Sequence, residues 1–187
     1  MIDWTKSMQQ TFEYYTVNPD TWKDAAKIDN VRSCTISRDS EVETLGSATI
    51  DVSDSIGESY VRIYLVVTQK DDMQKEITEK IPLGTYLVQT PTSTYDGKIR
   101  SVTMDAYTPL LELKDNLPPL GYSVLKGDNI MNRAYQIIRE HARAPVSETD
   151  SDTTLYYDFV ANSNDNWLSF LIDLISNAKY HFDLDEM

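Results

Sequence analysis

The chain has 187 residues, of which 41% are hydrophobic and 10% aromatic, so it is long and apolar enough to bury a core, and global disorder is excluded. Its 17 Lys and Arg against 30 Asp and Glu give a net charge of −13, and such a surface repels nucleic acid and anionic membranes. Cys34 is the only cysteine, which excludes an intramolecular disulfide and a cysteine-rich zinc site.

The beginning of the sequence, MIDWTKSMQQ, lacks the basic start and the apolar stretch of a signal peptide. The longest apolar run, IYLVV at Ile63 to Val67, is far too short to span a bilayer. We therefore expect a soluble chain that is synthesised in the cytosol.

Several segments of the first half carry the signals of β-strands. Residues 11–17 (TFEYYTV) are aromatic and β-branched, and a further strand is predicted over residues 31–37. Ala48, Ile50 and Val52 alternate with polar residues, the period of a half-buried strand. In residues 59–69 one face holds Val61, Ile63, Leu65 and Val67, and the other face is partly apolar, which predicts a central strand. Between the first two strands, Trp22 to Ile28 is predicted to form a helical turn.

A long β-hairpin is predicted over residues 82–113. Residues 77–81 form the return strand that precedes it, with Pro82 at an edge or a bulge. Asp96-Gly97 is a strong turn signal that requires a positive φ at Gly97. On the returning strand, the alternation separates two faces, Val102, Met104 and Ala106 on one and Ser101, Thr103 and Asp105 on the other. With six or seven strands before Tyr107, the pattern predicts an antiparallel β-barrel or sandwich.

The pattern becomes helical after residue 107. Residues 109–114 predict a short helix, and NLPPLGY (116–122) is a Pro/Gly-rich boundary. We therefore predict two domains, an antiparallel β-barrel over residues 1–115 and a smaller α/β domain over residues 116–187, in an α+β fold.

Two helices are predicted in the smaller domain. The first begins at Asp128 as N-cap and presents Ile130, Ala134, Ile137, Ile138 and His141 on one face. The second is capped by Asn164 or Asp165, and its apolar face holds Trp167, Leu168, Leu171, Leu174, Ile175 and Ala178. Short strands are predicted over residues 155–161 (LYYDFVA) and in the terminal KYHFDLDEM, with an acidic loop over residues 147–154.

No combination of residues requires an enzyme, and we predict no catalytic, cofactor-binding or metal-binding residues. His141 and His181 are not spaced as metal ligands, and His141 lies on an apolar helix face, where a structural role is expected. Cys34 lies in a strand and is interpreted as a small buried hydrophobe.

The acids and tyrosines leave alternatives open. Asp150, Asp152 and Asp158 have the oxygens for a calcium ion but lack the glycine and further acids of an EF-hand, so a solvated loop is favoured. Asp183, Asp185 and Glu186 read as an exposed face, although a carboxylate pair for glycoside hydrolysis remains open. The 12 tyrosines suggest a sugar-stacking surface, but most lie in predicted strands or helix faces, where packing explains them.

From about Val31 to its end, the chain resembles the baseplate-hub or tail-hub proteins at the tips of phage tails and related contractile tails. The resemblance lies in an ordered series of fold motifs and not in catalytic residues. These motifs are ISRDSEVETLGSATIDVSD, YVRIYLVV, PLGTYLVQTP with its Asp-Gly hairpin, SVTMDAYTPLLEL, PPLGYSVLKGDNIMNRAYQIIREHARAP and FVANSNDNWLSFLIDLISNAKYHFDLDE.

The resemblance implies a structural protein of the virion tail tip. Such hubs are trimers that close the tail tube and carry spike or tip proteins, and each subunit has two tube-type β-barrel domains with an α/β domain between or beside them. This chain then corresponds to the first barrel and the beginning of the α/β domain, so we expect the natural chain to continue and these residues alone to be monomeric or weakly associated. The implied partners are the tube or distal-tail ring and the spike or tip protein, with no nucleic acid, membrane or cofactor.

The residues support this role independently, because an acidic surface disfavours contact with the phosphates of DNA that passes through a tail. Two alternatives remain: a glycan-binding or receptor-binding module that uses exposed tyrosines, and a cell-wall hydrolase in which two acids meet in a cleft.

Overall fold

The computed structural model describes residues 2–54, 56–70, 74–89, 91–98 and 100–187. The chain forms two compact units. The first comprises Met1–Ser37, Ser47–Ala106 and Asp185–Met187, and the second comprises Arg38–Gly46 and Tyr107–Leu184. The sequence predicted a boundary between two domains at residues 115 and 116. The division into compact units does not test that boundary, which stays a prediction.

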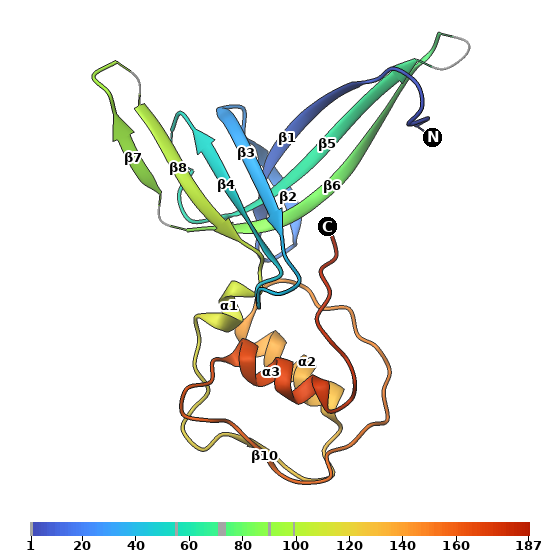
Figure 1. Ribbon diagram of the computed structural model, residues 1–187, viewed down its shortest axis with the longest axis vertical. Helices are drawn as coiled ribbons and strands as arrows, with labels where there is room; N and C mark the ends of the chain where they lie inside the picture. Colours follow the sequence, from blue (N-terminus) through green and yellow to red (C-terminus); the bar gives the residue numbers. More distant parts are fainter. Residues whose placement is uncertain (1, 55, 71–73, 90, 99) are drawn as a thin grey trace. The chain divides into compact units, whose positions relative to one another are not determined.

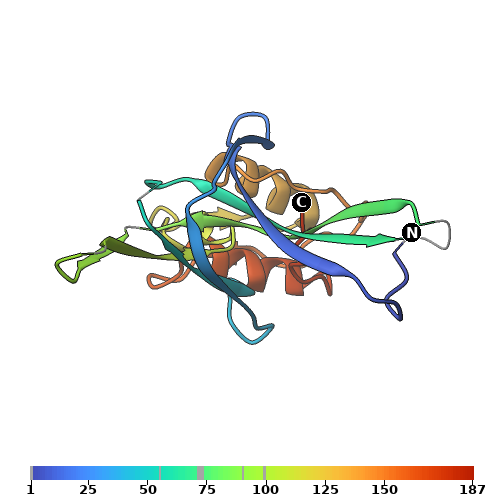
Figure 2. The ribbon, with the colours of Figure 1, turned by 90° about the horizontal axis from the view of Figure 1, so that it is seen from above.

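The first unit is an eight-stranded, mostly antiparallel sheet (Figure 1). Seven strands follow one another in the order β2-β1-β5-β6-β8-β4-β3, and β7 pairs with β8 outside that path. The strands are β1 (Gln9–Asn18), β2 (Lys23–Lys27), β3 (Val31–Arg38), β4 (Gly46–Val52), β5 (Tyr60–Lys70), β6 (Glu76–Val88), β7 (Thr92–Tyr95) and β8 (Arg100–Tyr107). Figure 2 shows the β5–β6 and β7–β8 hairpins pointing away from each other.

The core of this unit lies on one face of the sheet. It is the face that the alternation of apolar and polar residues predicted to be buried. Ala48, Ile50 and Val52 of β4 are at most 2% exposed, and Val102, Met104 and Ala106 of β8 are fully buried. They pack with Val61 and Ile63 of β5, the predicted central strand, which pairs with β1 and β6. Burial on the side that alternation indicates confirms the predicted faces of these strands.

Of the two placements predicted for Pro82, an edge or a bulge, the structure has the bulge, and Gly97 has the predicted positive φ. The pairing of β5 with β6 shifts between Ile63–Gly84 and Tyr64–Pro82, so Leu83 is the extra residue of a bulge next to Pro82. Gly97 has φ +90°, which confirms the positive φ expected in the turn between β7 and β8.

Two predictions for the first unit need correction or remain open. The helical turn predicted at Trp22–Ile28 is wrong, because Lys23–Lys27 is strand β2 and pairs antiparallel with β1. A closed barrel is not confirmed: in the part of the chain that the structure describes, the strand order runs from β2 to β3 and no pairing joins those two. The α+β class holds, since a mostly antiparallel sheet is accompanied by three helices.

The second unit packs its helices around a separate core. It contains α1 (Leu111–Lys114), α2 (Ile130–His141), α3 (Trp167–Ser176) and a two-stranded ribbon of β9 (Ser123–Val124) and β10 (Phe159–Val160). Every residue of the predicted apolar face of α3 from Trp167 to Ile175 is buried, as are Ile130, Ala134, Ile137 and Ile138 of α2. These faces form one cluster with Leu113 and Val124, which confirms both helices.

The predicted helix caps are each displaced toward the helix. The N-cap of α2 is Asn129, whose side chain accepts a hydrogen bond from Asn132 N, while Asp128 pairs with Arg133. The N-cap of α3 is Asn166, which exchanges hydrogen bonds with Ser169 in a capping box. Adjacent Asp and Asn residues have similar capping strength, so only the geometry selects between them.

Two strands predicted in the last third of the chain are shortened or absent. Of residues 155–161, only Phe159–Val160 form a strand, paired with Val124 and Ser123. The terminal segment has no strand among its described residues, so the strand predicted there is wrong. Asp183 and Asp185 are exposed, and Phe182 and Leu184, which alternate with them, pack on the second core. Among the described residues, no neighbouring strand forms a ladder with this segment.

Candidate functional site

The outward face of β3, β4, β7 and β8 carries only short polar side chains over its central part, and we call it the hydroxyl face. Thr92 and Thr94 of β7 lie opposite Thr103 and Ser101 of β8, on the side away from the core. The members are Ser33, Thr35, Ser37, Ser47, Thr49, Asp51, Thr92, Thr94, Ser101, Thr103 and Asp105. Between Ser33 and Ser37 of β3, Ser47 and Asp51 of β4, and Ser101 and Asp105 of β8, every residue that alternation points outward is Ser, Thr or Asp; Val31 and Tyr107 at the strand ends are not members.

Hydrogen bonds across three strands order this face. Asp51 of β4 accepts from Ser33 Oγ of β3 at 2.6 Å and from Thr103 Oγ1 of β8 at 2.7 Å. Thr49 Oγ1 lies 3.4 Å from Asp105 Oδ1 as a second, longer link. The Ser33 hydrogen bond, followed by that of Thr103, holds the pKa of Asp51 below its ordinary value of 3.8. Asp51 is therefore a carboxylate at neutral pH.

Such a face is suited to contact with water and not to capture of a ligand. Hydroxyl and carboxylate groups are well hydrated, and the members named above include no apolar side chain and no cation. A polyanion meets two carboxylates here; Arg32 of β3 acts electrostatically on Asp51, so it is the net charge of −13 that disfavours adhesion of a polyanion.

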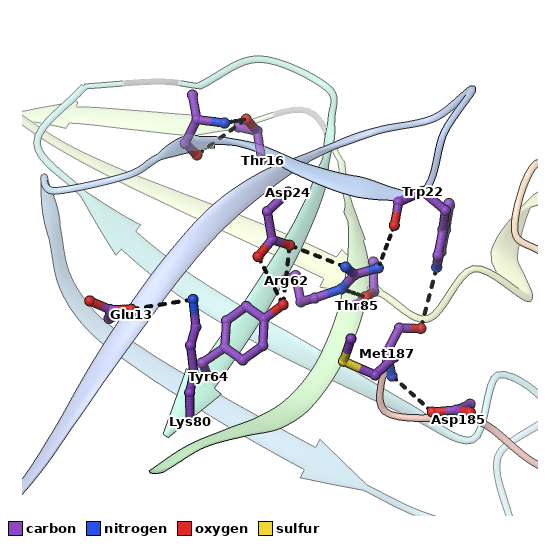
Figure 3. A network of polar contacts seen from close by, with 11 residues as sticks. Glu13, Thr16, Trp22, Asp24, Arg62, Tyr64, Lys80, Thr85, Asp185 and Met187 are labelled. Atoms are coloured by element: carbon purple, nitrogen blue, oxygen red, sulfur yellow. Dashed lines mark hydrogen bonds and ion pairs between the residues drawn. The ribbon is translucent and has the colours of Figure 1, made fainter. Parts of the chain in front are cut away.

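The same side of the sheet, away from the core, carries a charged network on β1, β2, β5 and β6, because Arg62 and Tyr64 alternate with the core residues Val61 and Ile63 (Figure 3). Arg62 of β5 is 3% exposed, and all three nitrogen atoms of its guanidinium group have partners. Its Nη1 lies 3.1 Å from Asp24 Oδ1, its Nε donates to Thr85 Oγ1 at 2.8 Å, and its Nη2 donates to Trp22 O at 3.3 Å. These partners satisfy the charge that burial would otherwise make costly.

Aromatic rings and acids continue this network. Tyr64 donates its hydroxyl hydrogen bond to Asp24 Oδ2 at 2.9 Å, and burial raises the pKa of Tyr64. The ammonium of Lys80 lies 3.9 Å from the ring centres of both Tyr15 and Tyr64, a cation–π arrangement. Lys80 also lies 3.4 Å from Glu13 Oε2. Arg62 pairs with Asp24 and Lys80 with Glu13, so every charge of this set has a partner within it and the network joins the four strands.

The two histidines that the sequence offered as candidates for chemistry lie in different surroundings. The His141 ring stacks on Trp167 at 4.5 Å, as expected of a structural histidine, and His181 is exposed at the surface. Among the described residues, no three His, Cys, Asp or Glu side chains gather closely enough to hold a metal ion. Asp158, one of the acids considered for calcium, accepts a hydrogen bond from Lys126 N at 2.8 Å.

Cys34 and most tyrosines have the packing roles expected of them. Cys34 is partly buried against the first core, and burial raises the pKa of its thiol to about 11, far from that of a nucleophile. Burial also raises the pKa of its neighbour Tyr14 to about 12. Tyr60, Tyr64, Tyr86 and Tyr135 are buried, whereas Tyr95, Tyr156 and Tyr157 are at least 70% exposed.

Sequence reasoning found part of the hydroxyl face and missed the charged network. The alternation separated Ser101, Thr103 and Asp105 from the core residues of β8, but the sequence does not reveal that β8 lies beside β4. Arg62 within a central apolar strand was the available signal for the network, because a buried guanidinium requires partners.

Comparisons with known proteins bear on the fold. No protein-family model and no curated protein matches the sequence. The structure is similar to the tail protein from Neisseria meningitidis MC58, with a TM-score of 0.56 and 8% identity over 88% of this chain and 45% of that one. A PdpA–VgrG complex in a lidless form gives a TM-score of 0.48 and 11% identity over 91% of this chain and 32% of that one, too weak a likeness to carry an argument.

The chain thus spans less than half the length of the Neisseria tail protein, and at this identity the likeness is one of fold. At the level of fold, the resemblance to tail proteins that the sequence motifs indicated is confirmed. No helix in the described residues is long and apolar enough to cross a membrane.

Proposed function

We propose that this protein is a structural component of a phage tail tip, of the baseplate-hub type, in which the hydroxyl face forms part of the wall of the tail channel. The observation that carries the proposal is the hydroxyl face itself, in a chain whose fold is similar to that of a tail protein. A channel wall for DNA must remain hydrated and must not hold phosphates, and a Ser/Thr/Asp surface on a rigid sheet meets both requirements.

In this proposal the protein is located in the virion and contacts the tube or distal-tail ring on one side and a spike or tip protein on the other. It acts as a homotrimer in the full assembly and performs no catalysis. The support is physical: the net charge of −13 disfavours DNA binding.

The experiment introduces cations on the hydroxyl face in the virus that encodes the protein. Thr49→Lys and Thr103→Lys place ammonium groups next to Asp105 and Asp51. We expect particles to assemble with normal tails and to release DNA more slowly, with a defect that diminishes at high salt because screening weakens phosphate contacts.

Ser163→Lys is the matched control, since Ser163 is exposed in the loop before α3 and lies in the second unit. It adds the same charge away from the hydroxyl face, so DNA release should be unchanged. Equal release rates for all three variants and the unmodified particle would refute the channel-wall role. Absence of the protein from purified tails would refute the tail role as a whole.

A further inference from the structure

A depression of about 420 Å³ in the second unit combines apolar, aromatic and polar groups. Ile130 and Leu155, both buried, line it together with Tyr156, Tyr157, Asp158 and Asn177. Its volume lies within the usual range for small-molecule sites, roughly 300–1,000 Å³. Neither the charged network nor the hydroxyl face includes any of these residues.

The two tyrosines are held in place by the backbone but are not used by the core. Tyr156 is 84% exposed and Tyr157 is 81% exposed, although Leu155 before the pair and Phe159, the second residue after it, pack inward. Gly127 N donates to Leu155 O at 2.9 Å, and Phe159 pairs with Val124, so the segment between them is fixed at both ends. Two large aromatic side chains on a backbone held at both ends and left in solvent are expected to contact a ligand.

Polar groups beside these rings are positioned to accept hydrogen bonds. Lys126 N donates to Asp158 Oδ1 at 2.8 Å, which orients the carboxylate, and Oδ2 accepts no hydrogen bond from the described residues. Asn177 donates through Nδ2 to Asp173 O at 2.8 Å, which orients its amide, and its Oδ1 accepts none from the same residues. The two side chains thus present acceptors on a fixed framework.

We infer that this depression binds a neutral saccharide. The C–H face of a sugar ring packs on a tyrosine ring, and the sugar hydroxyls donate to Asp158 and Asn177. The residues that line the depression include no Lys or Arg, and the chain has a net charge of −13, so an anionic ligand is disfavoured. A concave site of this volume also matches one or two sugar rings better than the flat core of a protein interface.

The inference is independent of the proposed tail role, and its test uses the whole chain labelled with ¹⁵N. Chitotriose, cellotriose and maltotriose are each titrated to about 10 mM while amide chemical shifts are followed. We expect saturable shifts confined to residues 154–160 and 177 with at least one of the three, with a Kd on the order of 1 mM, typical of a small and shallow site.

Tyr156→Ala and Tyr157→Ala should each weaken that binding by about tenfold, which corresponds to about 1.4 kcal/mol. Tyr95→Ala is the matched control, because Tyr95 is 70% exposed on β7 in the first unit and should leave the affinity unchanged. All variants should keep the amide spectrum of the folded chain.

Absence of saturable shifts with all three saccharides would overturn the inference, as would unchanged affinity in both tyrosine variants. Concentration-dependent self-association of the unmodified chain that Tyr156→Ala and Tyr157→Ala abolish would identify these tyrosines as a protein interface, and it would overturn the saccharide assignment as well. None of these results bears on DNA release by the Thr49 and Thr103 variants, so the two proposals fail separately.

Discussion

Arg62 and Asp24 form an ion pair with an Nη1–Oδ1 distance of 3.1 Å, in which the Arg62 side chain is 3% exposed and that of Asp24 is 29% exposed. The pair joins β5 to β2 across β1, so it couples the edge strand that the sequence did not predict to the centre of the sheet. Because Arg62 is far more buried than Asp24, removing Asp24 leaves a buried charge without a partner, and this determines the loss of stability.

Asp24→Ala should destabilise the protein by about 2–3 kcal/mol, because it leaves the buried guanidinium without its counter-charge; partial solvent access to Asp24 keeps the loss below that of a fully buried pair. Chemical denaturation with urea measures the change. Asp29→Ala is the control, since the Asp29 side chain is 82% exposed and lies 3.9 Å from Lys27, and its cost should be below about 0.5 kcal/mol.

A double-mutant cycle with Arg62→Met then isolates the pairwise contribution. The double variant should recover part of the stability that Asp24→Ala loses, since no uncompensated charge is left in the sheet. Equal losses for Asp24→Ala and Asp29→Ala would contradict the account.

We predict that Asp51, on the hydroxyl face, has a pKa below its ordinary value. Hydrogen bonds from Ser33 and Thr103 stabilise the charged form of Asp51, so its folded pKa lies below the unfolded value near 3.8. The resulting stabilisation is present above pH 3.8 and is lost as the pH falls through the lower folded value. Carboxyl ¹³C NMR titration should show the Asp51 midpoint below 3.8.

Removing both donors tests the cause. The double variant Ser33→Ala and Thr103→Ala should raise the Asp51 pKa toward its ordinary value, whereas Thr35→Ala, an exposed hydroxyl of the same strand, should leave it unchanged. An unchanged midpoint in the double variant would show that these hydrogen bonds do not form in solution.

The features that could be predicted from the sequence are those that depend on residues close together in the chain. Alternation located the buried faces of β4 and β8 because each strand has one apolar side, and the same physics located the buried face of α3 at helical spacing. The bulge beside Pro82 was predictable because proline cannot donate a ladder hydrogen bond.

The remaining features depend on which strands become neighbours. All five residues of β2 are exposed, so no apolar alternation marks it, and only its pairing with β1 makes it a strand. The hydroxyl face requires β8 to lie between β6 and β4, a pairing between segments far apart in the sequence. The terminal residues show the converse: Phe182 and Leu184 alternate as in a strand, but no ladder forms without a neighbour.

The turn between β7 and β8 depends on its glycine for backbone conformation and not for space. Gly97 has φ +90°, and a Cβ added there would meet no atom within 4 Å. Gly97→Val should therefore lower stability by about 1–3 kcal/mol through backbone strain alone, seen as a lower Tm.

Two companion variants separate conformation from bulk. Gly97→Asn should cost less, because asparagine tolerates positive φ, and Lys98→Val should be nearly neutral, because it adds a β-branched residue at the adjacent exposed position. If Gly97→Val melts at the same temperature as the unmodified chain, the turn does not require positive φ.

The second unit depends on the buried face of α3 for its core. Leu171 is fully buried and packs in one cluster with Leu168, Leu174 and Ile137. Leu171→Ala should cost about 2–5 kcal/mol, from lost transfer free energy and from the cavity that remains. Urea denaturation measures the change, followed by tryptophan fluorescence, to which Trp167 contributes from the same cluster, where it is 3% exposed.

Asp173→Ala provides the reference on the same helix, since Asp173 is exposed two residues further along and only its backbone carbonyl accepts hydrogen bonds from Ser176 and Asn177. Its cost should be within about 0.5 kcal/mol. A Leu171→Ala loss as small as that of Asp173→Ala would mean that this face of α3 is exposed in solution. The packing of α3 against α2 would then be wrong, since large apolar side chains without a covering element mark an interface instead of a core.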